Sequence, residues 1–557
     1  MKITFLGASG FVTGSSYLLE INDFRLLIDC GLFQGSKIIK ELNYGEFSYD
    51  PTNIDAVILT HAHIDHSGLI PKLIKKGYNG NIYATPETID LDTVMLPDSG
   101  HIQEMEIERK NRKRTRAGLP ELTPIYTAEN ALAAIDAFVP VKYNKNVSLS
   151  PDINFEFIDA GHILGSAHVI LNIKEGDIWK KIVFSGDIGT MGQPYIEDPK
   201  KITDADIIVM ENTYGNRKHI DKSNRLEILA GLINSAVALG GNIIIPAFAI
   251  ERTQDILYYL GELQNSKAIP TLPIYVDSPL AVAATKIFQN HPENFDKETI
   301  ELISTGKNPL SMKNLNFSIT TEDSIKLNEI ADGAIIISAS GMADAGRIKH
   351  HLKHNLWKRN ATVLFVGYQA EGTLGRRLIE GAEEVTIHGE KIAVHAQIKE
   401  LSGFSAHADQ SELLSWLLIT GSKSENVVLV HGETSSLNDF SELVREKMGK
   451  NTIIPELGEN IEFKNNGEVI RNKPEKPWLE VIEENLEKKS EVYQGKYIIS
   501  EKDSKNKKVS ISQVNRSYNM MTRNIQSIMD KAKKEKNYDK MIATFDSISK
   551  MLEELKK

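Results

Sequence analysis

The chain has 557 residues, 41% of them hydrophobic and 25% charged, which suits a globular protein of three or four domains. Its single cysteine, Cys30, excludes a disulfide scaffold and a zinc site made of thiolates, and a formal net charge of −10 argues against a general nucleic-acid coat protein. The N-terminus lacks a signal-peptide pattern and no apolar run is long enough to span a membrane, so we expect a cytoplasmic protein.

Residues 1–30 predict a hairpin, with apolar strand runs at 3–6, 16–20 and 25–29 around a glycine-rich turn. Asp29 closes the last of these runs. A carboxylate at such a position either caps a helix or turn, or orients histidines that hold a metal. The sequence leaves both interpretations open.

Residues 56–60 predict a buried strand, because the run is short, apolar and rich in strand formers. Just past its end, on a turn before a helix expected near Ser67, come His61, His63, Asp65 and His66. Imidazole and carboxylate groups are ligands that Zn²⁺ takes. Because neighbouring residues cannot all face one ion, the cluster indicates more than one metal. The alternative is that these residues lie on the surface and have no role. Packing would then give no reason for unpaired imidazoles on a tight turn.

Two helices are expected next, over residues 69–75 and 87–118. The second is long and polar, and the basic run 109–116 lies near its end. This run is either a solvated helix face, which we favour, or a surface that follows phosphates.

Two later runs repeat the pattern of an apolar strand followed by glycine and one ligand-type residue. Residues 154–159 lead to His162, and residues 181–185 lead to Asp187. The carboxyl ends of parallel strands meet at one edge of a sheet. We therefore expect the ligands that follow all three runs to lie at a shared edge.

From about residue 200, strand runs alternate with helical stretches, which predicts a parallel α/β domain. The runs are 206–210, 241–246, 273–276, 334–338 and 362–366. Glu211 follows the first run, and Arg252 opens a helix. Ser338, Ser340 and Gly341 precede a helix, where they either hold a phosphate or cap that helix. The basic stretch 347–354 carries three histidines, for which we favour a solvated face over a metal site.

Ligand-type residues return after residue 400. His407 precedes a helix, and the strand run 426–430 ends in His431. An inserted domain explains why these residues are so far in sequence from the first cluster. Beyond a linker near residue 470, the segments 514–532 and 538–555 have the apolar spacing of a coiled-coil seam. They predict a helical hairpin that either packs on its own domain or mediates self-association.

The collected imidazoles and carboxylates suffice for two metals that share one bridging ligand. The strand-end residues in question are Asp29, His61, His63, Asp65, His66, His162, Asp187 and His431. His407 is the histidine left over. We expect it to be the general acid for a phosphodiester leaving group, with Glu211 orienting its other ring nitrogen.

These residues resemble the motifs of the β-CASP branch of the metallo-β-lactamase superfamily. Asp29, the segment 61–68, His162 and Asp187 match the superfamily's motifs in order, and the branch's own motifs are matched by Glu211, His407 and His431. The resemblance implies an α/β fold: an αββα metallo-β-lactamase sandwich (1–200 and 396–470), interrupted by a parallel α/β β-CASP domain (201–395). Residues 471–557 are a C-terminal extension outside the resemblance.

The resemblance also implies a ligand set of two Zn²⁺ ions per chain, with Mn²⁺ as the alternative. One zinc takes His61, His63 and His162, the other takes Asp65, His66 and His431, and Asp187 bridges both. The DNA-processing members of the branch usually differ at the position of His431, which favours RNA.

We therefore expect a zinc-dependent ribonuclease, similar to the nuclease subunit of the mRNA 3′-end cleavage machinery. It would cut single-stranded RNA internally and leave 5′-phosphate and 3′-hydroxyl ends, because a deep cleft between the domains excludes a duplex. The residues expected to hold the RNA backbone are Arg252, Ser278, Ser338, Ser340, Gly341 and Ser405. The alternatives are a 5′→3′ exonuclease, a small-molecule (thio)ester hydrolase and a non-catalytic RNA-binding subunit. A homodimer through the C-terminal extension is a further expectation.

Overall fold

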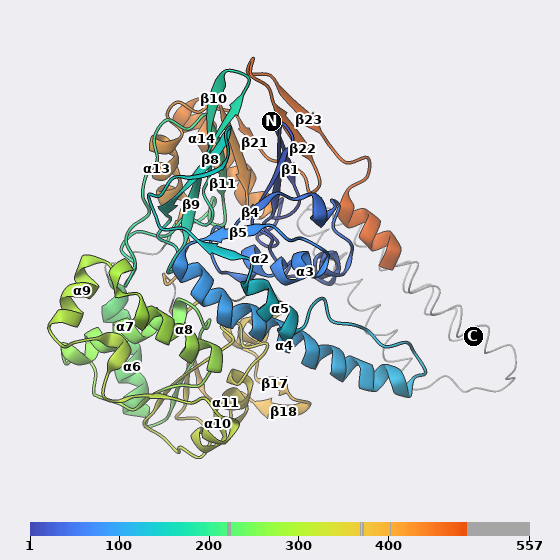
Figure 1. Cartoon of the computed structure of the whole chain (residues 1–557). Coiled ribbons are helices and arrows are strands. Elements are labelled where there is room, and N and C mark those ends of the chain that lie inside the picture. The colour runs from blue at the N-terminus through green and yellow to red at the C-terminus, as the bar shows by residue number, and fades with distance from the viewer. Residues whose placement is uncertain (220–223, 368, 370–371, 402, 487–557) are drawn as a thin grey trace, which may run out of the picture. The chain divides into compact units, whose positions relative to one another are not determined.

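The computed structural model describes residues 1–219, 224–367, 369, 372–401 and 403–486. The chain divides into two compact units, Met1–Ile482 and Glu483–Lys557, and the first contains almost all of the described residues (Figure 1). The predicted helical segments 514–532 and 538–555 lie outside the described residues, so the hairpin and a dimer formed through it stay predictions. Within the described ranges, no helix has both the length and the apolar character of a membrane span.

One sheet of the first unit has eight strands in the order β23-β22-β1-β2-β3-β4-β5-β6. The strands predicted within residues 1–30 are present and pair antiparallel, and β4 to β6 continue the sheet in parallel. The last two strands come from the other end of the unit and pair beside β1. The bounds are β1 (Lys2–Phe5), β2 (Tyr17–Ile21), β3 (Phe24–Ile28), β4 (Ala56–Ile58), β5 (Asn81–Ala84), β6 (Phe138–Pro140), β22 (Asn460–Phe463) and β23 (Val469–Asn472).

A second sheet has seven strands in the order β21-β20-β11-β10-β9-β8-β7. Strands β7 to β10 form an antiparallel meander, whereas β10, β11, β20 and β21 run parallel. Strand β11 therefore lies in this sheet, although the sequence pattern groups the run 206–210 with the strands of the inserted domain. The bounds are β7 (Val147–Ser150), β8 (Ile153–Asp159), β9 (Ala167–Glu175), β10 (Ile178–Phe184), β11 (Ile207–Glu211), β20 (Asn426–Val430) and β21 (Thr452–Ile453).

The two sheets share one apolar core between them, because alternate side chains of each strand point inward. Ile3 and Phe5 of β1 lie in the same buried cluster as Phe155 and Phe157 of β8. Helices α3 and α5 pack on the outer face of the first sheet, and α13 and α14 pack on the second, which confirms the expected αββα sandwich. The helices are α1 (Lys37–Glu41), α2 (Ile64–Ser67), α3 (Ile70–Lys75), α4 (Pro86–Arg116), α5 (Ala128–Ile135), α13 (Gln410–Thr420) and α14 (Thr434–Met448).

The inserted region forms a six-stranded parallel sheet in the order β14-β13-β15-β12-β16-β19, as the alternating pattern predicts. Its bounds are β12 (Ile243–Pro246), β13 (Ile274–Val276), β14 (Leu315–Phe317), β15 (Ile335–Ser338), β16 (Thr362–Phe365) and β19 (Gln397–Glu400), with a separate hairpin β17 (Glu384–Ile387) and β18 (Glu390–Ala393). Successive isoleucines of β12 enter different cores: Ile243 and Ile245 join one cluster and Ile244 joins another.

Helices on both faces of this sheet account for the two cores. Helices α6, α7 and α8 contribute to the core that contains Ile243, and α11 and α12 contribute to the core that contains Ile244. The bounds are α6 (Arg225–Leu239), α7 (Arg252–Asn265), α8 (Pro279–Asn290), α9 (Lys297–Ser304), α10 (Thr321–Leu327), α11 (Ile348–Asn355) and α12 (Leu374–Ile379). The first of these cores also includes Ile163 and Leu164 of the sandwich, so apolar packing continues from the insertion into the loop after β8.

Two local expectations were wrong. The helix expected near Ser67 begins earlier, as the short α2 at Ile64, so Asp65 and His66 lie within this helix rather than on a preceding loop. Nor do the three ligand-bearing strands share one sheet edge. Strand β4 belongs to the eight-stranded sheet, while β8 and β10 belong to the seven-stranded sheet. The ligand residues therefore converge from two facing sheets.

Candidate metal centre

Asp29 organises the loop between β4 and α2. Its carboxylate accepts hydrogen bonds from the backbone N–H of Thr60 (2.8 Å) and from the Thr60 hydroxyl (2.9 Å). The same carboxylate lies 2.7 Å from Nδ1 of His66. A carboxylate can only accept, so Nδ1 of His66 donates to it, and Nε2 is the nitrogen that this ring has left to offer a metal. These are the contacts of a group that orients a histidine, which was one of the two interpretations of Asp29.

Thr60, which the sequence analysis did not single out, fixes a second ring by the same logic. Its hydroxyl hydrogen is used toward Asp29, so the oxygen must accept from Nδ1 of His61 at 3.0 Å. The third ring, His162, has Nδ1 3.3 Å from the carbonyl oxygen of Ala406, which also can only accept. Nδ1 is thus engaged in His61, His66 and His162, and Nε2 is the nitrogen that each ring has left. In the neutral rings of His61 and His162, this Nε2 carries no hydrogen.

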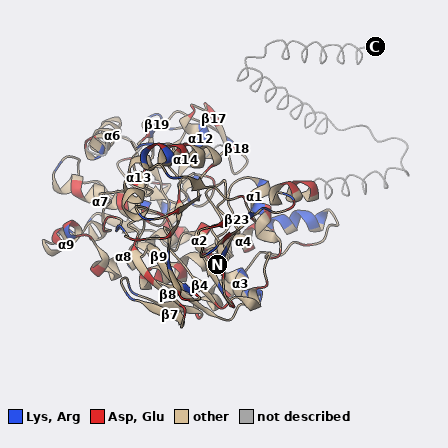
Figure 2. Ribbon diagram, turned by 90° about the horizontal axis from the view of Figure 1, so that it is seen from above, with Lys and Arg blue, Asp and Glu red and all other residues tan. Residues whose placement is uncertain are grey.

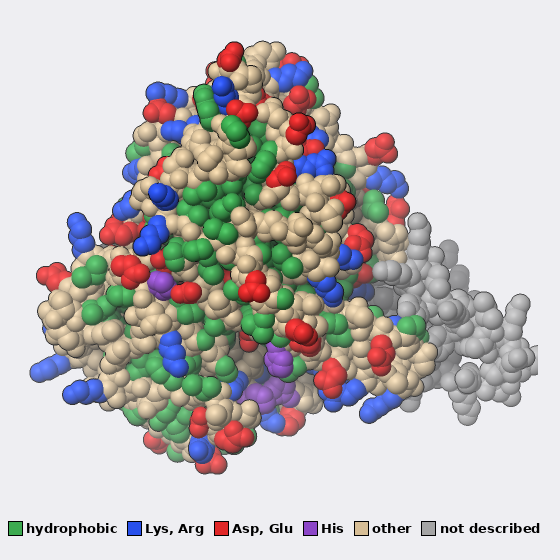
Figure 3. Space-filling view, in the orientation of Figure 1, with side chains coloured by type: hydrophobic (Ala, Val, Ile, Leu, Met, Phe, Trp, Pro, Cys, Tyr) green, Lys and Arg blue, Asp and Glu red, His purple; other side chains and the backbone are tan. Residues whose placement is uncertain are grey.

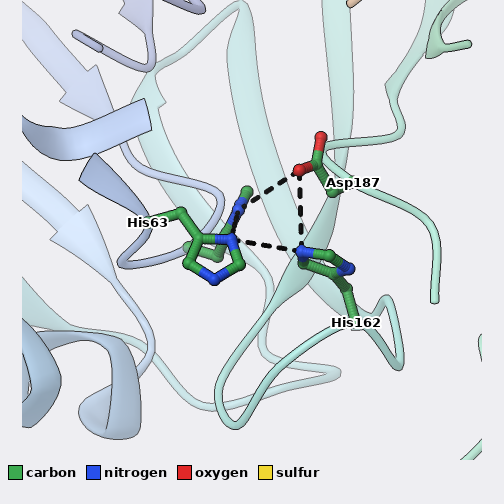
Figure 4. Close-up of side chains that lie close together, drawn as sticks. His63, His162 and Asp187 are labelled. Atoms are coloured by element: carbon green, nitrogen blue, oxygen red, sulfur yellow. Dashed lines mark hydrogen bonds and ion pairs between the residues drawn. The ribbon is translucent and has the colours of Figure 1, made fainter. Parts of the chain in front are cut away.

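Four side chains, those of His61, His63, His162 and Asp187, converge in what we call the first group. Within it, Nδ1 of His63 lies 3.2 Å from Nε2 of both His61 and His162. One oxygen of Asp187 completes it, 3.5 Å from Nε2 of His61 and 3.6 Å from Nε2 of His162. Figure 4 shows the rings of His63 and His162 turned toward each other and toward this carboxylate. A single N–H on His63 cannot satisfy two bare nitrogens, whereas a cation can face all of them.

The spacing of this first group fits zinc. Ligand atoms about 2.0–2.1 Å from a tetrahedral ion lie about 3.3–3.4 Å from one another. Burial lowers the pKa of His61 and of His162 well below the usual range, so both rings are neutral, which is the form that binds metals. Burial likewise lowers the pKa of His63 to about 4.

A second group contains Asp65, His66 and His431. Nε2 of His431 lies 3.3 Å from Nε2 of His66 and 3.5 Å from a carboxylate oxygen of Asp65. The second oxygen of Asp187 lies 3.4 Å from Nε2 of His66 and 3.6 Å from Nδ1 of His431. This oxygen is buried and accepts no hydrogen bond from the described residues. Asp187 thus turns one oxygen to each group, as a ligand shared by two metals would.

His407 and Glu211 form a pair beside the first group. Nδ1 of His407 lies 3.1 Å from Glu211, whose carboxylate also accepts from the backbone N–H groups of Ile188 (2.7 Å) and Thr213 (3.1 Å). The His407 ring lies 4.5 Å from the ring of His162, centre to centre. Burial favours the neutral ring, but the adjacent Glu211 carboxylate outweighs it and raises the pKa of His407 to about 9. The side chain keeps 21% of its surface exposed, so a substrate can reach it.

Two more residues that the sequence analysis missed hold this part of the centre. The hydroxyl of Thr213 lies 3.1 Å from Nδ1 of His431, and the ring nitrogen Nε2 of His219 lies 2.8 Å from the carbonyl oxygen of His407. Their partners are about two hundred positions away in the sequence. The only sequence signal for these two residues is therefore that both follow Glu211 closely.

The residues expected to hold an RNA backbone have partners within the protein. Ser278 caps α8 by accepting from the backbone N–H of Ala281, and the hydroxyl of Ser338 donates to the carbonyl oxygen of Asp277 (2.7 Å). Ser405 accepts from the backbone N–H of His407 (3.2 Å). The remaining three are also engaged: Ser340 with Ala345, Gly341 with Gln369, and Arg252 with Asp255. Neither Ser338 nor Ser340 caps α11, which begins at Ile348. Their phosphate-binding role stays a prediction.

Comparison with known proteins finds three family models along the chain. A model described as the metallo-beta-lactamase superfamily matches residues 9–229, a Beta-Casp domain matches 253–378, and a Zn-dependent metallo-hydrolase RNA specificity domain matches 391–455. A ribonuclease of Thermus thermophilus is 35% identical over 461 residues, which are 83% of this chain and 100% of that protein. The transcription termination factor FttA of Methanocaldococcus jannaschii is 30% identical over 466 residues, which are 82% of this chain and 70% of that protein.

Proposed function

We propose that this chain, which belongs to the β-CASP branch of the metallo-β-lactamase superfamily, is a zinc-dependent ribonuclease that cleaves single-stranded RNA. Membership of the family confirms the resemblance drawn from the motifs. The observation that carries the proposal is the carboxylate of Asp187, which faces imidazole nitrogens of two groups at 3.4–3.6 Å.

The first metal would be held by His61, His63 and His162, the second by Asp65, His66 and His431, and Asp187 would contact both. Imidazole and carboxylate ligands favour Zn²⁺, and Mn²⁺ is the alternative. When bound, two such ions acidify a water molecule and balance negative charge on phosphoryl oxygens.

The chain itself supplies the proton for the leaving group. The attacking water gives a proton to solvent as its oxygen forms a bond to phosphorus, and the bond from phosphorus to the 3′ oxygen breaks. A proton passes from Nε2 of His407 to the 3′ oxygen, and the ring regains a proton from solvent. Glu211 holds Nδ1 of His407 at 3.1 Å and so turns Nε2 outward. This sequence leaves a 5′-phosphate and a 3′-hydroxyl.

RNA as the substrate is supported by the relatives and by one exposed aromatic side chain. The Thermus thermophilus relative is named a ribonuclease, and the region around His407 and His431 matches an RNA specificity domain. Phe248 follows β12 at the carboxyl edge of the inserted sheet and is 46% exposed. Three residues further on, Glu251 accepts a hydrogen bond from the backbone N–H of Leu164 (3.3 Å), so this edge lies beside the His162 loop.

Phe248 is positioned to stack on an unpaired base, and Phe248→Ala is expected to raise KM for RNA. Stacking on an aromatic ring contributes about 1–3 kcal/mol per base, so the rise should be about tenfold or more, with kcat little changed. Steady-state cleavage of a labelled single strand measures both constants. Trp357→Ala is the matched control, because Trp357 is also exposed but precedes β16 at the opposite edge of the sheet. An unchanged KM in the Phe248 variant would contradict the stacking role.

The function is tested by digesting end-labelled single-stranded RNA with and without a chelator, alongside metal analysis of the protein. We expect internal cuts with 5′-phosphate ends, loss of activity in the chelator, and recovery when zinc is restored. RNAs with and without a 5′-monophosphate separate this activity from a 5′→3′ exonuclease, which would prefer the phosphorylated end. Cleavage that persists after metal removal, or hydrolysis of a thioester but not of RNA, would overturn the proposal.

A further inference from the structure

The last turns of α4 carry a dense group of cations that the metal centre does not use. Between Arg109 and Arg116, six of the eight residues are Lys or Arg and none is acidic, in a chain whose net charge is −10. Lys and Arg gather along this end of the helix (Figure 2). Over much of the face seen in Figure 3, acidic and basic side chains are instead interspersed.

These cations fall into two sets by their contacts. Lys110 pairs with Glu106 (3.6 Å), Arg112 pairs with Glu108 (3.6 Å), and Nε of Arg114 donates to the carbonyl oxygen of Pro120 (2.7 Å). The other three, Arg109, Lys113 and Arg116, are exposed and have no ion pair among the described residues. Their spacing of i, i+4 and i+7 puts them on one face of the helix, over about 10 Å of its axis.

Folding does not account for this cationic face, which we define as Arg109, Lys113 and Arg116. Like charges four residues apart, as at Arg109 and Lys113, lower helix stability. The helix dipole favours cations in the last turn only, so it covers Lys113 and Arg116 but does not reach Arg109.

The end of the helix is also held in place. The side chain of Asn111, on the other side of the helix, donates to the carbonyl oxygen of Leu122 (2.9 Å) and accepts from its backbone N–H (2.8 Å). The returning segment therefore fixes these turns and leaves the cationic face open to solvent.

The other end of α4 lies at the candidate metal centre. The hydroxyls of Thr85 and Thr88 both donate to the carbonyl oxygen of Gly165, in the loop that carries His162 (2.7 and 3.0 Å). From Thr88 the helix extends about 30 Å before it reaches Arg109. One continuous helix thus connects the loop of the centre to the cationic face.

We propose that the cationic face of α4 is a second RNA-binding surface, on which Arg109, Lys113 and Arg116 contact backbone phosphates of a strand whose scissile bond lies at the metal centre. This inference rests on the proposed ribonuclease function. It predicts that long RNAs engage both places, whereas an oligonucleotide short enough to fill only the centre does not reach the face. Phosphate contacts from unpaired cations are independent of base sequence and sensitive to salt.

The test compares two triple variants of the full chain with the same change in charge. Arg109→Gln/Lys113→Gln/Arg116→Gln removes the cationic face, and Lys110→Gln/Arg112→Gln/Arg114→Gln removes the partnered cations of the same turns. The measurement is binding of a long unstructured RNA by fluorescence anisotropy over a series of salt concentrations, in chelator. Each single-strand phosphate contact contributes about 0.7 to the slope of log K against log salt, so the first variant should lose about 2 and the control should lose much less.

Cleavage assays separate this inference from the function on which it rests. We expect the first variant to cleave the short oligonucleotide as the unmodified protein does, and to show a raised KM only on the long RNA. The single variant Arg109→Gln should lose about 0.7 of the slope. Because Arg109 lies outside the last turn, this loss would show that the effect does not come from a changed structure at the helix end. Equal slopes in both triple variants, as expected if an acidic protein binds this face, would overturn the inference. An unmodified protein that cleaves no RNA would instead overturn the proposed function.

Discussion

His407→Ala is expected to slow RNA cleavage by about 10²–10⁴-fold while the zinc content of the protein stays unchanged. The reason is geometric. Nδ1 of His407 is held by Glu211 at 3.1 Å, whereas the nearest oxygen of Asp187 is 3.9 Å away. His407 therefore stands beside the ligand groups without joining either of them. Its loss should remove the proton donor and leave the ligand atoms where they are.

Cleavage rates on a single-stranded RNA and metal analysis of the same preparations measure this outcome. Substrates with a better leaving group should be less affected, because they need less protonation as the bond breaks. His350→Ala is the control, since His350 lies on α11 next to His388 and outside the centre. A variant of His407 that loses zinc would show that the residue is structural, and one that cleaves at the original rate would remove it from the mechanism.

Glu211→Gln provides an intermediate case. The amide can still accept from Ile188, which lies 2.7 Å away, but it no longer stabilises a positive charge on the His407 ring. We expect a smaller loss of activity than in His407→Ala, since the orientation survives and only the charge is removed.

The sequence predicts much of this centre because its ligands follow short apolar strands. Runs that end in glycine and one polar residue identify strand ends, and Asp187 and His162 are found in that way. The glycines have a physical role that the pattern does not reveal. A side chain at Gly31 would lie 1.7 Å from the carbonyl oxygen of Asp65, and one at Gly189 would lie 1.6 Å from that of Gly161. Only glycine permits the loops that follow β3 and β4, and those that follow β8 and β10, to approach so closely.

The sequence does not reveal which strands belong to which sheet. The run 206–210 has the same apolar composition as the strands of the insertion, yet β11 pairs with β10 and β20. Pairing depends on register with other segments, one of which, β20, is more than two hundred residues away, and composition carries no information on it. Thr60 and Thr213 were missed for a related reason. A threonine hydroxyl is recognisable as the partner of a ring nitrogen only when the fold has brought the two together.

The histidine-rich helix is another place where the sequence pattern does not reveal which side chains are buried. The pattern favours a solvated face for residues 347–354, and His350 and His354 are partly exposed. His351 is fully buried instead, with Nε2 2.6 Å from the carboxylate of Asp277. Successive residues of a helix point about 100° apart, so a cluster of like residues in sequence divides between surface and core.

Asp187→Ala is expected to remove nearly all activity and to lower the number of zinc ions retained per chain. The carboxylate faces His61 and His162 with one oxygen and His66 and His431 with the other. Burial raises the cost of its charge, but the neighbouring His431 and His66 rings hold the pKa of Asp187 well below its usual range. It is therefore an anion at neutral pH, and its removal leaves both groups of ligands without the charge that they share.

The variants Asp187→Asn and Asp29→Asn are expected to differ in how much metal binding and activity they lose. In the first variant, the new side-chain amide would donate hydrogen bonds to the bare ring nitrogens and fill the space of a cation, so we expect a loss as severe as with alanine. Asp29 contacts His66 from behind, at 2.7 Å, and its replacement should cost only about 10–100-fold in metal affinity or activity, as is typical of an outer contact. Metal analysis and cleavage rates on the three variants give the order. Comparable activity in Asp187→Ala would mean that one ion suffices and that the shared carboxylate does not couple two.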